Sequence, residues 1–374
     1  MTAVASPSLL KQIQHRAAYV GIRAGLTLPL VAGLQPSLET ARIVGRAFGG
    51  SSINRKRVTR GAERVMQAFP ELDQDGAHEL VLRSYEHLAM LAVEIAMAPR
   101  MINRTTWSRY VELGEIGDLL RSLYKGKPTV FVTGHMGNWE ILGTSVGVIG
   151  VPTTAIYRPL DLPPLDTWVR RVRRERGLEL LDKNRAAAEV PKLMAAGGRP
   201  AFVADQNAGD RGLFTPYFGR LASSYKSIGL VAMQQQADVI VSSAHRIGWD
   251  DNAHDEDGRS LGNLAGGARF HLTMEDAITP EEYMAAPDPL FYLTARYRRA
   301  LEMSVKRHPE QYLWMHRIWK SRPKHERDNK PFPDSLRRKL AELPWMTDAD
   351  VEAIVDRSDR DRAWLKENGK DRLP

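Results

Sequence analysis

The sequence of 374 residues contains no cysteine. This absence excludes disulfide bonds, thiolate metal ligands and a thiol nucleophile. The chain also lacks a long uninterrupted apolar run. The segment that most nearly forms such a run is residues 17–34, but it contains Arg23, Pro29 and three glycines. It is therefore a poor candidate for a membrane span or a signal peptide. We predict that this segment lies on a membrane surface, with a true span and an ordinary core helix as the alternatives.

Acidic side chains are scarce at the amino-terminal end. Residues 1–66 contain ten lysines and arginines but only Glu39 and Glu63 as acids, and the whole chain has a net charge of +8. An excess of positive charge favours anionic partners, and its concentration at one end predicts contact with a negative surface. Nucleic acid is not expected, because neither a recognised binding motif nor aromatic residues interleaved with the basic ones are found.

The pattern of apolar residues divides the chain into three parts. Residues 1–125 carry apolar residues at helical spacing and are predicted to form a helical section. Residues 126–325 alternate short β-branched runs with helical stretches, which predicts an α/β core whose mixed, largely parallel sheet is flanked by helices. The strands are expected at 128–134, 153–157, 200–204, 238–242 and 268–273. Residues 248–267 are predicted to be an exposed loop, and 326–374 a charged tail.

The sequence Gly134-His-Met-Gly-Asn-Trp-Glu140 directly follows the first predicted core strand. Ligands of α/β sheets bind outside the carboxyl ends of the strands, so this segment is well placed for chemistry. His135 and Glu140 are five residues apart and meet only across a turn, which Gly134 and Gly137 permit. A carboxylate on one ring nitrogen would leave the other nitrogen free to take a proton. By itself, however, this spacing is also common in structural histidines.

Further stretches match one protein family in the same order. They are Tyr157-Arg-Pro159, Ala204-Asp-Gln206 with Gly212, Pro216-Tyr-Phe-Gly219, and His308–His316 with Trp319-Lys320. With the H-x-x-x-x-E pattern they resemble the bacterial lipid A late (lauroyl/myristoyl) acyltransferases, over roughly residues 10–325. The resemblance implies a glycerolipid-acyltransferase-like fold, and a fatty acyl transfer that needs no cofactor.

The resemblance also implies partners and roles. The donor would be an acyl carrier protein or coenzyme A thioester, and the acceptor a hydroxyl of a lipid A precursor or related glycolipid. Another membrane lipid is the alternative acceptor. His135 would be the general base and Glu140 its orienting carboxylate. The protein is then expected at the cytoplasmic face of the bacterial inner membrane, as a peripheral or monotopic enzyme.

Several other residues are candidates for substrate binding. Arg158 follows a predicted strand and suits a phosphate or an oxyanion, or else a salt bridge to Asp161 or Asp166. Backbone N–H groups near Gly137 and Asn138 are alternative oxyanion donors, and Asn138 itself is a candidate contact.

Asp205 also ends a predicted strand, where it would assist the base, bind a sugar hydroxyl or act as a buried structural acid; Gln206 follows it. Arg174 belongs to a basic helix, 170–176, that would dock an acidic carrier or phosphorylated lipid, or else form a solvated face.

A metal-dependent hydrolase built on His135, Glu140, Asp205 and His245 is the competing hypothesis, and it predicts bound zinc. His316 is a further histidine near aromatic residues, in a stretch we expect to pack on the core. No second close pair of the H-x-x-x-H or E-x-x-H type is present in the sequence. We therefore predict no metal site.

Overall fold

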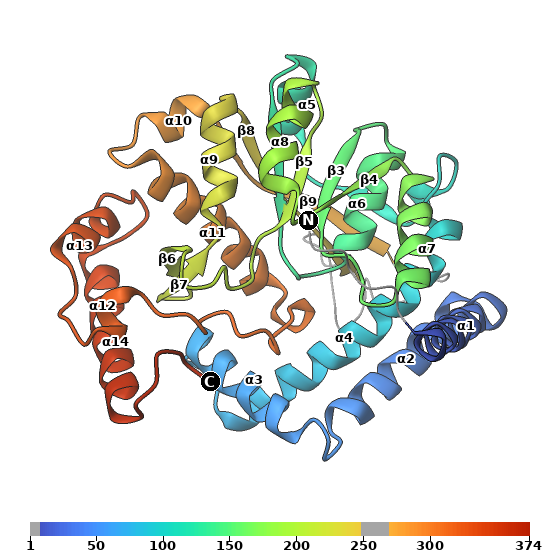
Figure 1. Cartoon of the computed structure of the whole chain (residues 1–374), viewed down its shortest axis with the longest axis horizontal. Helices are drawn as coiled ribbons and strands as arrows, with labels where there is room; N and C mark the ends of the chain where they lie inside the picture. The colour runs from blue at the N-terminus through green and yellow to red at the C-terminus, as the bar shows by residue number, and fades with distance from the viewer. Residues whose placement is uncertain (1–7, 248–268) are drawn as a thin grey trace, which may run out of the picture.

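A seven-stranded sheet forms the centre of the molecule (Figure 1). The computed structural model describes residues 8–247 and 269–374. The strand order is β1-β9-β8-β2-β5-β3-β4, and among these described strands only β8 and β9 pair antiparallel. The strands are β1 (Val111–Leu113), β2 (Thr129–Thr133), β3 (Thr153–Tyr157), β4 (Leu178–Asp182), β5 (Pro200–Val203), β8 (Asp238–Ile247) and β9 (Arg269–Ile278). The predicted mixed, largely parallel sheet is confirmed.

Both faces of the sheet are covered, because the central strands are apolar on both sides. Val130 and Val132 of β2 face a core shared with α8 (Ala186–Ala195), α9 (Lys226–Gln235) and α11 (Pro289–Arg307). Phe131, between them, packs on the opposite face with Leu119 of α5 (Gly117–Tyr124). Side chains alternate across a strand, so a continuous apolar run is what a doubly covered strand requires.

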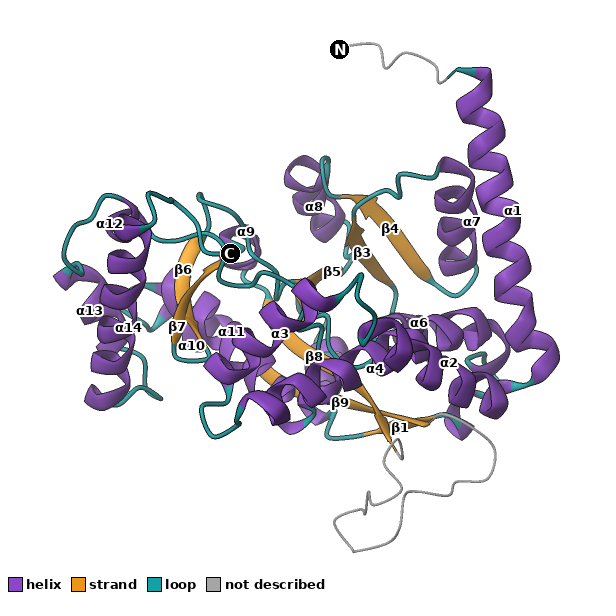
Figure 2. Ribbon diagram, turned by 90° about the horizontal axis from the view of Figure 1, so that it is seen from below, coloured by secondary structure: helices purple, strands orange, loops and turns teal. Residues whose placement is uncertain are grey.

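The first four helices form the predicted helical section. They are α1 (Leu9–Ala32), α2 (Leu34–Gly49), α3 (Arg55–Ala68) and α4 (Gln74–Met101). The long α4 runs beside the sheet, and Figure 2 shows α1 extending along one side of the molecule. α1 contains no buried residue, although it contacts α4 and α7 (Pro163–Arg174). Within the described residues, no helix has the length and apolarity needed to cross a membrane.

The carboxyl-terminal part of the chain, in which a charged tail was predicted at 326–374, contains three helices. These are α12 (Lys324–Arg327), α13 (Asp334–Ala341) and α14 (Asp348–Glu367). Leu340, Val351 and Ile354 bury a small apolar core against Leu221 and Phe291 of the main body. A two-stranded hairpin, β6 (Leu213–Tyr217) and β7 (Arg220–Ser224), lies between them and the sheet. The exposed loop predicted at 248–267 lies outside the described residues.

The remaining short elements join these layers. They are α6 (Trp139–Val148), α10 (Pro280–Met284), and the single turns η1 (Trp107–Arg109) and η2 (Pro309–Gln311). α6 begins immediately after the predicted catalytic turn. η2 leads into the segment 312–320, which is hydrogen-bonded to that turn.

Candidate active site

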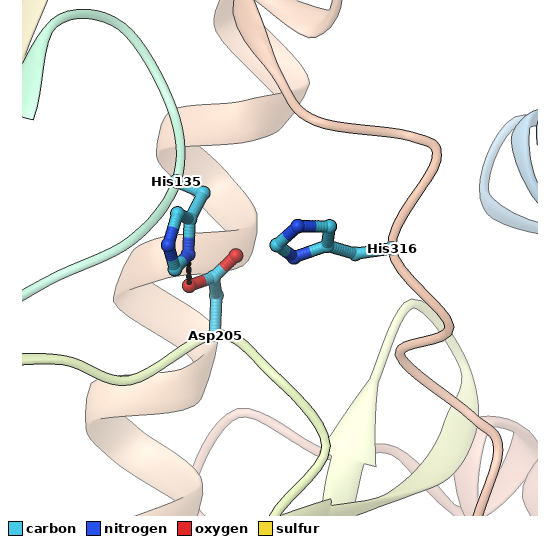
Figure 3. A group of neighbouring side chains, drawn as sticks. All are labelled: His135, Asp205 and His316. Atoms are coloured by element: carbon cyan, nitrogen blue, oxygen red, sulfur yellow. Dashed lines mark hydrogen bonds and ion pairs between the residues drawn. The ribbon is translucent and has the colours of Figure 1, made fainter. Parts of the chain in front are cut away.

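Two neighbouring parallel strands bring a histidine and an aspartate together. β2 and β5 pair with Thr133 opposite Val203, so two residues further on His135 stands opposite Asp205. His135 Nδ1 lies 2.8 Å from Asp205 Oδ1, and Figure 3 shows the two side chains turned toward each other. Asp205 is completely buried. The chemistry predicted for the carboxyl ends of the strands therefore has a defined geometry at the β2–β5 edge.

A third side chain, His316, comes from the segment after η2. This segment is fixed to the catalytic turn because Leu313 N–H donates to the carbonyl oxygen of His135. The rings of His316 and His135 lie 4.9 Å apart between centroids. Gln206 lies between them: its Nε2 is 2.9 Å from Nδ1 of His316 and 3.3 Å from Nε2 of His135. Gln206, a predicted substrate contact, is thus beside the candidate base.

The charges in this cluster are set by burial and by the His135–Asp205 pair. Burial opposes a charged His135, but the carboxylates of Asp205 and, more weakly, Glu140 outweigh it and raise the pKa of His135. Burial alone would raise the pKa of Asp205; the nearby His135 instead lowers it to about 2. Burial and the neighbouring His135 lower the pKa of His316 to about 4. Asp205 is therefore ionised and His316 neutral near pH 7.

The turn that carries His135 depends on Gly137. Its φ of +54° is left-handed, and a Cβ placed there would lie 2.1 Å from the carbonyl oxygen of Ala244. The backbone N–H groups of this turn are already used: Gly137 donates to Gln311 O and Asn138 donates to Ala244 O. Our expectation that these two groups serve the oxyanion is corrected, since neither is free to point at a substrate.

Asn138 is wholly buried and holds the turn from inside. Its Oδ1 accepts from the N–H groups of Glu140 and Ile141, so it caps α6, and its Nδ2 donates to Glu94 at 2.7 Å. Arg246 donates to the same Glu94 carboxylate at 2.7 Å. Asn138, predicted to bind substrate, has no exposed surface with which to do so; it acts here as a structural residue.

Glu140 has a different partner from the one expected. Its carboxylate accepts two hydrogen bonds from the guanidinium of Arg173 in α7, one of them 3.0 Å long from Nε. The carboxylate on Nδ1 of His135 is that of Asp205. The reason is geometric: Glu140 lies in the first turn of α6, whereas Asp205 ends the strand next to β2. The structure therefore pairs His135 with Asp205 and Glu140 with Arg173, and the orienting role predicted for Glu140 stays a prediction.

The two arginines proposed as substrate contacts lie on the surface. The Arg158 side chain is 68% exposed and pairs with Asp161 at 3.4 Å, one of the two salt bridges considered above. Arg174 pairs with Glu179 at 3.0 Å and is also exposed. In this structure neither makes contact with His135, so any role they have in binding lies outside the catalytic cluster.

Among the described residues, His135, Asp205 and His316 form a group whose nitrogen and oxygen atoms lie close enough to ligate one metal ion. The set proposed for a metal-dependent hydrolase is not assembled, however. His245 is buried elsewhere with its Nε2 2.8 Å from Ser304 Oγ, and Glu140 is paired with Arg173. The short hydrogen bond between His135 and Asp205 is equally what a base and its orienting carboxylate need.

Sequence reasoning missed His316, Arg173 and Glu94 as parts of the site. A signal for His316 was present, since it ends a stretch that matches the resembled family. Arg173 lies among five similar arginines and Glu94 in the middle of a helix, so nothing local distinguishes either residue.

Comparison with known proteins identifies the family of the chain. Residues 21–250 match the family model of the bacterial lipid A biosynthesis acyltransferases, which is more than half of the chain. The chain belongs to this family. The lipid A biosynthesis palmitoleoyltransferase of Escherichia coli K12 is 22% identical over 273 residues, 72% of this chain and 80% of that protein.

Two further relatives have related names. The lipid A biosynthesis acyltransferase of Shigella flexneri is 22% identical over the same fractions of the two chains. The lipid A biosynthesis lauroyltransferase of E. coli K12 is 22% identical over 262 residues, 68% of this chain and 76% of that protein. The family and its relatives indicate that the chain is an acyltransferase.

Proposed function

We propose that this acyltransferase moves a fatty acyl chain from a thioester donor to a hydroxyl of a lipid A precursor or related glycolipid, with His135 as general base. The single observation that carries the proposal is the 2.8 Å contact between Nδ1 of His135 and the buried, ionised Asp205. That contact fixes the proton on Nδ1 and leaves the lone pair on Nε2 for a substrate. Family membership supplies the reaction class.

The reaction then follows from the two ring nitrogens. Nε2 of His135 takes the proton of the acceptor hydroxyl as its oxygen attacks the thioester carbonyl carbon. The imidazolium is stabilised by Asp205, which stays ionised. The tetrahedral intermediate collapses by breaking its carbon–sulfur bond, and the thiolate leaving group takes the proton back from Nε2. The products are an ester and a free thiol, and His135 is neutral again.

The negative oxygen of the intermediate needs a donor, and we assign that role to the Gln206 amide. Its Nε2 lies within 3.3 Å of Nε2 of His135, so a small shift places an N–H on an oxygen next to the base. His316 is neutral and holds the amide through its 2.9 Å contact. The backbone donors considered from the sequence are already engaged in the turn.

The pair formed by Glu140 and Arg173 serves the site indirectly in this proposal. It ties the first turn of α6 to α7, and its carboxylate adds a weaker contribution to the raised pKa of His135. Glu140 is thus a positioning residue, and Asp205 the carboxylate that acts on the base.

The amino-terminal helices provide a surface for membrane attachment. Large apolar side chains on α1 are exposed, among them Leu28 (69%) and Val31 (88%), and α2 adds Ile43. Basic residues Arg16 and Arg23 lie on the same helix as the first two. An exposed apolar and basic helix that does not span suits a peripheral position on an anionic leaflet. We place it at the cytoplasmic face of the inner membrane, where thioester donors are made.

The test is acyl transfer by purified protein in detergent. Acyl carrier protein and coenzyme A thioesters are each offered with a lipid A precursor, and the ester product is identified by mass spectrometry. Transfer by wild type together with its loss in His135→Ala supports the proposal. Undiminished transfer by folded His135→Ala disproves the role of the base. Transfer only to a different lipid hydroxyl retains the reaction and replaces the acceptor.

The same assay separates transfer from metal-dependent hydrolysis. Activity that persists after chelation, in protein with no stoichiometric zinc by elemental analysis, agrees with base catalysis. Stoichiometric zinc that is lost in His316→Ala, together with release of free fatty acid in place of the ester, would assign the cluster to metal chemistry instead.

A further inference from the structure

A strongly basic cleft is lined in part by the residues that follow His316. Its volume is about 460 Å³, and it is lined by α3, α14 and residues 317–320. Seven cationic side chains line it, against two acids, Glu63 and Asp361. The cationic residues are Arg60, Arg64, Arg220, Arg317, Lys320, Arg357 and Arg360.

Two acids neutralise only part of the charge of seven cationic side chains. Asp361 is shared by Arg220, Arg322 and Arg357, so its charge is already more than balanced. Within residues 8–247 and 269–374, no Asp or Glu side chain forms a salt bridge with Arg60, Arg317 or Arg360. Exposed, unpaired cations facing one cavity repel each other, and an anion in the cavity would relieve that repulsion.

Arg64 makes the imbalance costly because it is buried. Only 7% of it is exposed, and its two hydrogen bonds, both 3.4 Å, go to the peptide oxygen of Trp314 and to the carboxyl group of the last residue, Pro374. Burial, followed by the charge of Arg317, lowers the pKa of Arg64 to about 10. A buried guanidinium that makes only long hydrogen bonds beside another cation destabilises the fold, and an anion bound in the cleft would offset this cost.

One segment of chain, residues 316–320, contributes His316 to the candidate active site and Arg317, Trp319 and Lys320 to the cleft. Arg317 directly follows His316, whose ring centroid lies 4.9 Å from that of His135. Arg64 donates to the carbonyl oxygen of Trp314, two residues before His316. Two tryptophans, Trp319 and Trp364, also line the cleft and offer flat apolar surface beside the charges. A ligand in the cleft would therefore contact residues that directly follow His316 in the sequence.

We propose that this cleft binds a phosphate ester group of one of the two substrates and so anchors that substrate with its reactive end toward His135. The inference rests on the proposed function for the identity of the substrate. Guanidinium groups recognise phosphate in a bidentate manner, which suits a cluster of arginines better than a carboxylate-rich site. Thioester donors carry phosphates on coenzyme A or phosphopantetheine, and phosphorylated glycolipids carry them on the sugar, so either substrate has the required chemistry.

The experiment compares two triple variants of the full chain. The cleft variant is Arg60→Gln, Arg317→Gln and Arg360→Gln, all at exposed positions. The control variant, Arg104→Gln, Arg109→Gln and Lys125→Gln, removes the same charge from exposed positions elsewhere. Calorimetric titration measures binding of coenzyme A in one arm and of a deacylated, phosphorylated glucosamine disaccharide in the other. We expect one of these probes to bind about tenfold or more weakly to the cleft variant, with the control variant like wild type.

The arm that changes identifies the source of the phosphate, and KM for the same substrate is expected to rise while kcat changes little. Equal binding of both probes by the cleft and control variants overturns the proposal. So does a loss in the cleft variant that is confined to binding of anionic vesicles, since that assigns the charge to the membrane surface.

Failure of this inference is separable from failure of the proposed function. His135→Ala is expected to bind both probes like wild type. If His135→Ala abolishes transfer and the cleft variant binds like the control, only the cleft assignment fails. If the cleft variant no longer binds one of the probes and His135→Ala still transfers the acyl chain, the cleft assignment is supported and the role of His135 as base is disproved.

Discussion

The region at the carboxyl ends of β2 and β5, called here the β2–β5 edge, and the helix α1 differ in the kind of side chain that they bury. At the edge, polar side chains are buried and matched: His135 with Asp205, and Asn138 and Arg246 with Glu94. On α1, apolar side chains are exposed, and none of its residues is buried. A buried polar group is retained only where its geometry is satisfied, whereas an exposed apolar helix is completed by something outside the chain. In our proposal, the carboxyl ends of β2 and β5 carry the chemistry, and α1 provides the attachment to the membrane.

The largest effect is expected at His135. His135→Ala removes the proton acceptor, so acyl transfer should fall by about 10³-fold or more, measured as initial rate with saturating donor. His78→Ala, at an exposed position on α4, is the matched control and should transfer like wild type. Comparable rates in the two variants, with both folded by circular dichroism, would show that His135 does not take part in the reaction.

A comparison of two carboxylates sharpens the assignment within the edge. Asp205→Asn should lower transfer by about 10² to 10³-fold, because the tautomer and the imidazolium lose their support. Glu140→Gln should lower it only about tenfold, through loosening of the pair with Arg173. An equal or larger loss for Glu140→Gln would reverse the two roles.

The pH profile of the same variants gives an independent reading. His135 must be neutral to accept a proton, and Asp205 raises its pKa. The rate should therefore rise with pH through a value above 6.5, the ordinary pKa of histidine. In Asp205→Asn the charged imidazolium is no longer stabilised, so the rise should move to lower pH. A rise that stays in place, or moves upward, contradicts the pairing.

The supporting network should show its effect in stability. Glu94→Gln removes the carboxylate that accepts from the buried Arg246 and weakens the contact to Asn138, so the free energy of unfolding should fall by about 3 kcal/mol. Denaturant titration measures it. The control is Glu112→Gln on β1, which breaks a half-exposed salt bridge to Arg269 and is expected to change the free energy of unfolding by less than about 1 kcal/mol. An equally small change for Glu94→Gln would mean that the turn does not depend on this pair.

The smallest effect concerns α1 and leaves the chemistry intact. Leu28→Gln with Val31→Gln removes exposed apolar surface, so binding to vesicles that contain phosphatidylglycerol should weaken about tenfold. Leu120→Gln with Leu230→Gln removes similar exposed surface elsewhere and should bind like wild type. Transfer to a short-chain acceptor in detergent should be unchanged in both. If the α1 variant keeps full vesicle binding, attachment lies on another surface.

Much of the sheet was predictable because central strands have a strong local signal. The β-branched run 128–134 became β2 and the run 238–242 began β8. β4 was missed: it lies at the sheet edge, where Leu178–Asp182 needs only one buried side and includes the polar Glu179. The hairpin of β6 and β7 was missed as well, since its burial depends on the carboxyl-terminal helices that cover it.

The sequence by itself determined the reaction class, the position of His135 after a strand, and the basic, interrupted character of the amino-terminal segment. Each of these can be read along the chain, from residue types within a segment or from short motifs in a fixed order, without knowing which distant residues meet. Only the tertiary structure decided that Asp205, seventy residues away, pairs with the base, and that Glu140 turns to Arg173. It also brought α3, α14 and residues 317–320 together into one basic cleft. Pairing between distant residues depends on strand order and helix packing, which no short stretch of sequence encodes.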